Sequence, residues 1–124
     1  MTIEDLSRLY GACPQAGALV KVLAEPATRH IYIQGAQASA TPLLFASVAD
    51  RVAVPVVFIL PDADEAGYFY HDLTQIMGQE RVLFFPSSYR RSVRHGQRDA
   101  ANEILRTEVL GRLSSRSSGD VLYV

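Results

Sequence analysis

Residues Gly35 to Pro42 have the layout of a nucleotide-binding loop, because an apolar stretch, IYIQ, leads into a run of small residues. A phosphate loop needs glycines that bring backbone N–H groups around the phosphates, a lysine that reaches the terminal phosphates, and a Ser or Thr hydroxyl that holds magnesium. The pattern is Gly-x4-Gly-Lys-Ser/Thr. Aligning it on Gly35 places Ala40, Thr41 and Pro42 at the positions that require Gly, Lys and Ser/Thr.

These three residues cannot supply the chemistry of a phosphate loop. Alanine is a poor host for positive φ, threonine carries no charge, and proline has neither a hydroxyl nor an N–H to point at an anion. Lys21 is the only lysine among 12 basic residues, and it lies before the loop on another expected helix. The sequence therefore predicts a degenerate loop that binds no cofactor, and it nominates no catalytic residue.

Histidine and cysteine give no metal site or nucleophile. His30, His71 and His95 are widely spaced, without acids or cysteines at metal-ligand spacing, so we expect them to be solvated. Cys13 is the single cysteine, which excludes an internal disulfide framework and a multi-cysteine zinc site. No basic group lies near it to favour the thiolate. The sequence predicts no bound metal.

A basic loop is the remaining candidate site. Four arginines lie between Pro86 and Arg98 with no acid among them: Arg90, Arg91, Arg94 and Arg98. Such a cluster suits a nucleic-acid phosphate backbone, ion pairs with an adjoining domain, or a solvated loop. Interdomain ion pairs suit arginine best, while nothing near the cluster is suited to read base edges.

Composition indicates one soluble globular domain. The chain has 124 residues, of which 48% are hydrophobic and 20% charged, with a net charge of −1. This balance differs from that of disordered chains and provides no global field toward nucleic acid or membranes. The longest apolar run, VAVPVVFILP, is too short to span a bilayer. We expect a cytoplasmic protein with no membrane partner.

Two short helices are expected in a lead-in over residues 1–25. Thr2 and Asp5 form a Thr-x-x-Asp helix start, and Pro14 suits the first position of a second helix. From residue 29 to 124 the pattern alternates between strand and helix. The expected strands are 29–34, 54–61, 81–85 and 121–124.

Three helices are expected between these strands. The first is capped by Thr41 and runs from Pro42 to about Arg51. The second has an Asp62-x-x-Glu65 start and a left-handed cap at Gly78, and the third spans 99 to about 113. This order predicts an α/β fold, a parallel sheet with flanking helices that is P-loop NTPase-like (RecA-like). Because the last expected strand is apolar to its end, we expect an amino-terminal fragment of a longer chain.

Three stretches carry a resemblance to a known family: FILPDADEAGYFYHDL, RVLFFPSSYRR and RTEVLGRL. They resemble the amino-terminal segment of bacterial transcription-repair coupling factor (Mfd), which is itself similar to the first domain of the excinuclease subunit UvrB. The resemblance covers essentially the whole chain. Its most specific parts are the helix start from Asp62 to Ala66 and the FFP strand end before an aromatic loop.

The resemblance implies a non-catalytic UvrB-like module at the start of an ATP-driven DNA translocase. That protein displaces stalled RNA polymerase and recruits UvrA for nucleotide excision repair. ATP and magnesium would bind a motor far downstream, and the partners would be other domains of the same chain, RNA polymerase, UvrA and double-stranded DNA. The UvrA-contacting surface belongs to a neighbouring domain, so no residue here is assigned to it.

Two other protein classes fit parts of the pattern. The first is a small stand-alone NTPase or kinase with an atypical phosphate loop. The second is a signalling receiver domain, which requires an acid cluster at strand ends and a lysine late in the chain. No lysine follows Lys21, which argues against the receiver domain.

Overall fold

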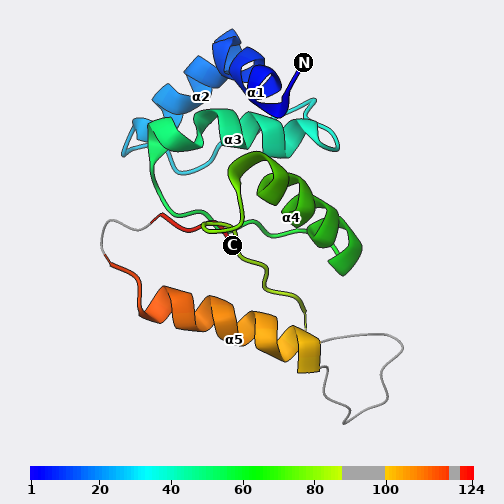
Figure 1. Ribbon diagram of the computed structural model, residues 1–124. Coiled ribbons are helices and arrows are strands. Elements are labelled where there is room, and N and C mark those ends of the chain that lie inside the picture. Colours follow the sequence, from blue (N-terminus) through cyan, green and yellow to red (C-terminus); the bar gives the residue numbers. More distant parts are fainter. Residues whose placement is uncertain (88–99, 118–120) are drawn as a thin grey trace.

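The computed structural model describes residues 1–87, 100–117 and 121–124, and these residues form five helices (Figure 1). The helices are α1 (Ile3–Ala12), α2 (Pro14–Ala24), α3 (Ala40–Val52), α4 (Ala63–Met77) and α5 (Ala100–Ser114). Helix α3 contacts α1, α2 and α4. Helix α5 lies at the opposite end of the molecule from α1 and α2 (Figure 1).

The prediction of a parallel-sheet, P-loop NTPase-like α/β fold is wrong. The described residues contain no strand, and the segments expected as strands form only two isolated parallel bridges, from Val56 and from Val82 to Tyr123. Residues 29–34 form no backbone hydrogen bond with any described residue. β-Branched and aromatic residues favour an extended backbone, but a strand also needs a partner along its length.

Three sequence-predicted helix starts are confirmed. In α1 the Thr2 N–H donates to Asp5 Oδ2 at 2.9 Å, and the Asp5 N–H donates to Thr2 Oγ1 at 3.1 Å. These bonds form a capping box, which satisfies N–H groups that have no partner inside the helix. Pro14 occupies the first turn of α2. In α4 the Glu65 N–H donates to Asp62 Oδ1 at 2.8 Å.

Helix α3 differs from its prediction at the amino-terminal end. It begins at Ala40 instead of Pro42, and its N-cap is Ser39 instead of Thr41. Ser39 has φ −66° and ψ −9°, and its side chain makes no capping bond. The preceding Ala38 has a φ of 48°, so the chain turns sharply before the helix. The turn therefore starts α3 earlier than the residue types indicate.

Gly78 ends α4 as predicted, but in another conformation. Its φ is 84° and its ψ is 168°, so the positive φ that favours glycine is present without left-handed helical ψ. The Gly78 N–H donates to the Thr74 carbonyl at 2.9 Å. Helix α5 agrees with its expected position, since it begins at Ala100.

Residues 121–124 lie between two other extended segments. On one side the Val56 N–H donates to the Leu122 carbonyl at 3.1 Å, the Val124 N–H donates to the Val56 carbonyl at 3.0 Å, and the Phe58 N–H donates to the Val124 carbonyl at 2.7 Å. Alternate residues of a parallel pair direct their N–H and C=O groups toward the same neighbour. Backbone groups of Leu122 and Val124 thus point toward the 56–58 segment.

The opposite side of this central segment pairs with residues 81–83. The Tyr123 N–H donates to the Arg81 carbonyl at 2.8 Å, and the Leu83 N–H donates to the Tyr123 carbonyl at 2.7 Å. The central segment therefore joins two segments that are distant from it in sequence.

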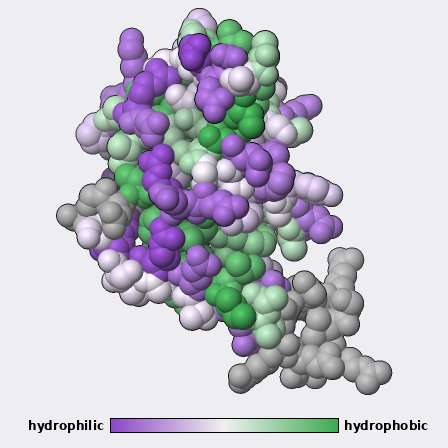
Figure 2. Space-filling model, in the orientation of Figure 1, coloured by the Kyte–Doolittle hydropathy of each residue, from purple (hydrophilic) through white to green (hydrophobic). Residues whose placement is uncertain are grey.

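The core has two parts, one on each face of these extended segments. Toward α3 and α4 the buried cluster consists of Ala49, Leu73, Val82 and Tyr123. Toward α5 it consists of Leu83, Val109 and Leu122. Neighbouring residues of an extended segment point to opposite faces, so Leu122 and Tyr123 belong to different clusters. Figure 2 shows apolar surface still exposed between hydrophilic patches, including a region near the α5 end.

Tyr123 is the largest fully buried side chain, with 1% of its surface exposed. Its ring packs edge-on against Phe45, with the centroids 5.1 Å apart. Its hydroxyl has no hydrogen-bond partner among the described residues. Burial raises the pKa of this hydroxyl above its ordinary value of 10.0; the Arg81 charge opposes the shift and the Asp50 charge adds to it.

None of the helices formed by the described residues is both long and apolar enough to cross a membrane.

We expect Asp62→Ala to lower the free energy of unfolding by about 1 kcal/mol, because it removes the side-chain acceptor at the start of α4. Asp64→Ala is the matched control, since Asp64 also lies in the first turn of α4 but makes no capping bond. Its expected loss is about 0.3 kcal/mol, from the helix dipole alone. Urea denaturation measures both values, and equal losses would contradict the capping role.

We expect Tyr123→Phe to raise the free energy of unfolding by about 1 kcal/mol at neutral pH, since it removes a buried hydroxyl without a partner. The folded protein keeps the Tyr123 proton at pH values where the unfolded chain loses it. Titration of this group therefore leaves the free energy of unfolding unchanged well below pH 10.0 and lowers it as the pH rises from 10.0 through the higher folded pKa.

The Tyr123→Phe variant should consequently lose less stability than the parent protein above pH 10.0. Tyr68→Phe is the control, because 75% of Tyr68 is exposed. It should change neither the free energy of unfolding at neutral pH nor the loss of stability above pH 10.0. Urea denaturation across this pH range makes the comparison. A destabilised Tyr123→Phe variant at neutral pH would show that the hydroxyl has a partner after all.

Candidate functional site beside the Gly35–Pro42 loop

The four residues of the degenerate loop lie on an exposed turn and the first turn of α3. Gly35 has a φ of 90°, in the region that favours glycine. Ala40 and Thr41 begin the helix, and Pro42 is fully buried. The two ends of the loop thus differ in burial: Gly35 is exposed, whereas Pro42 is buried.

Two backbone N–H groups at the start of α3 are used inside this turn. The Ala40 N–H donates to the Gln37 carbonyl at 3.0 Å, and the Thr41 N–H donates to the Ala38 carbonyl at 3.3 Å. Pro42 has no N–H. A helix amino terminus binds anions through free N–H groups, and three consecutive positions here offer none.

A hollow of about 570 Å³ lies between this turn and α4. The α4 wall carries two carboxylates, Glu65 and Asp72, with Tyr68 between them in sequence. On the opposite wall the Ser39 hydroxyl donates to Asp72 Oδ2 at 2.7 Å. Negative charge beside the loop repels phosphate, so the electrostatics of the hollow disfavour a nucleotide.

The contact between Ser39 and Asp72 is structural in its chemistry. A catalytic serine needs a base within hydrogen-bond reach and a third group that orients the base. Here the hydroxyl donates directly to a carboxylate, and the described hydrogen bonds include no third group in this arrangement. The bond ties the turn before α3 to α4, across 33 positions of sequence.

The basic loop lies outside the described residues. Arg90, Arg91, Arg94, Arg98 and also His95 all fall within residues 88–99. The prediction that this loop meets an adjoining domain or a phosphate backbone stays a prediction.

The other two histidines, His30 and His71, are exposed. Within residues 1–87, 100–117 and 121–124, no group of three or more His, Cys, Asp or Glu side chains is placed to hold a metal ion. Cys13 is partly buried and is a free thiol.

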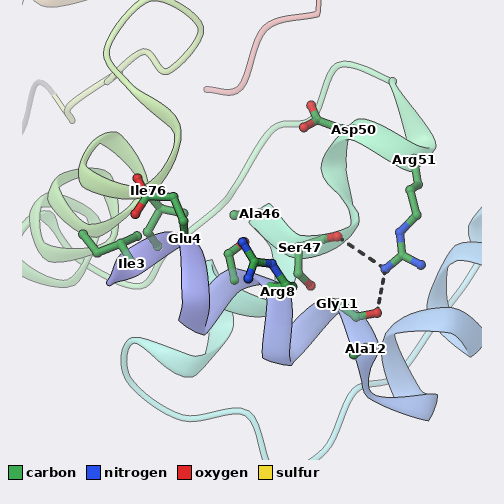
Figure 3. A pocket seen from close by; sticks show the side chains of 11 residues that line it. Ile3, Glu4, Arg8, Gly11, Ala12, Ala46, Ser47, Asp50, Arg51 and Ile76 are labelled. Carbon is green, nitrogen blue, oxygen red and sulfur yellow. Dashed lines mark hydrogen bonds between the residues drawn. The ribbon is translucent and has the colours of Figure 1, made fainter. Parts of the chain in front are cut away.

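A second polar hollow, of about 540 Å³, lies between α1 and α3 (Figure 3). Arg51 Nη2 donates to the carbonyls of Gly11 and Ser47, at 3.3 Å in each case. The last carbonyls of a helix lack partners inside it, and Arg51 supplies one at the end of α1. Sequence reasoning missed this role. The signal was a basic residue in the last turn of α3, but nothing in the sequence indicates α1 as its neighbour.

The comparisons with known proteins provide no relative. No protein-family model, curated protein or solved structure matches this chain. The interpretation of the site therefore depends on the residues and their geometry.

A double-mutant cycle on Ser39→Ala and Asp72→Ala should give a coupling energy of about 1 kcal/mol in urea denaturation. The hydroxyl-to-carboxylate bond of 2.7 Å is the physical reason. Thr41→Ala with Asp72→Ala is the matched control, because Thr41 lines the same hollow without bonding Asp72. Its coupling should be near zero. Equal coupling in both cycles would mean that the hollow responds as a whole and the bond contributes nothing specific.

Proposed function

We propose that this chain is a non-catalytic module that acts as a scaffold and interdomain contact in a transcription-repair coupling factor. The observation that carries the non-catalytic part is the state of the turn before α3. Its N–H groups at Ala40 and Thr41 are bonded to loop carbonyls, and Asp72 places a carboxylate beside it. A working phosphate site requires free N–H groups and positive charge at the same place.

The family assignment is supported by the residues of the resemblance. The helix start from Asp62 to Ala66 forms the capped beginning of α4, with Asp62 bonded to the Glu65 N–H. The FFP stretch leads directly toward the basic loop. The proposal uses these residues and the loop chemistry, and it does not use the parallel-sheet fold.

Within this proposal the activity belongs to the full protein. ATP and magnesium serve a motor elsewhere in that protein, which translocates on double-stranded DNA, displaces RNA polymerase and recruits UvrA. Contacts of the present chain are with other domains of the same protein, and the arginines of the basic loop are the residues best suited to them. No UvrA-contacting residue is assigned here.

A small stand-alone NTPase or kinase is the alternative function. It requires a cation at the phosphates and a hydroxyl that holds magnesium. Position 41 is a threonine and position 42 is a buried proline, and the nearest charged wall of the hollow is acidic. These observations favour the non-catalytic module.

We expect Mg-ATP at millimolar concentration to leave the melting temperature of this chain unchanged, since ligand binding to the folded state would raise it. Thr41→Ala should behave as the parent protein does. Thermal unfolding with and without Mg-ATP measures both. Stabilisation by several degrees that Thr41→Ala abolishes would overturn the non-catalytic proposal and favour the NTPase.

Sequencing the gene past codon 124 tests the family assignment separately. A continuing reading frame with an intact Gly-x4-Gly-Lys-Thr loop and an Asp-Glu-rich hydrolysis motif far downstream supports the coupling factor. A stop at that codon overturns it, whatever the Mg-ATP result.

A further inference from the structure

We draw no further inference here: the strongest candidate, the apolar hollow of about 440 Å³ between α3 and the extended segments 31–33 and 54–58, is an unpartnered surface, and nothing in the described part of the chain shows what covers it.

Discussion

The two-sided backbone pairing of residues 121–124 is the constraint on which the rest of the structure depends. Tyr123 bonds the 81–83 segment while Leu122 and Val124 bond the 56–58 segment, so one short stretch joins parts that are far away in sequence. Such long-range contacts require closure of long loops before they stabilise the fold. Once they form, side chains of the same stretch alternate between the core under α3 and α4 and the core under α5.

The turn before α3 is held by its own backbone bonds and by one side-chain bond to α4. Its N–H groups at Ala40 and Thr41 are satisfied by neighbouring carbonyls, and Ser39 bonds Asp72 across the hollow. A free helix amino terminus attracts anions, whereas a turn that is internally bonded and faces a carboxylate does not. These bonds hold the turn in place against α4.

The error in the fold class has a specific cause. The run VPVVFILP and the stretch RVLFF have the apolar, β-branched composition of strands buried on both faces, and both are extended in the structure. Composition sets the local backbone preference but not the number of paired neighbours. Residues 29–34 illustrate this difference, because Ile31 and Ile33 suit a strand while their segment forms no backbone bond with the described residues.

The sequence by itself determined the features that depend on neighbours within one helical turn. These include the capping box of Thr2 and Asp5, the bond from the Glu65 N–H to Asp62, and the loss of phosphate-loop chemistry at Thr41. Local hydrogen bonds follow from residue type and spacing because the helix fixes the geometry of both partners.

Only the tertiary structure decided which distant groups meet. The bond between Ser39 and Asp72, the reach of Arg51 to Gly11 and the burial of Tyr123 each join residues from separate elements. No local sequence pattern predicts these contacts, because they depend on how the helices pack and on which extended segments lie side by side. The physical reason is that residue spacing sets geometry within an element, whereas packing of the whole chain sets it between elements.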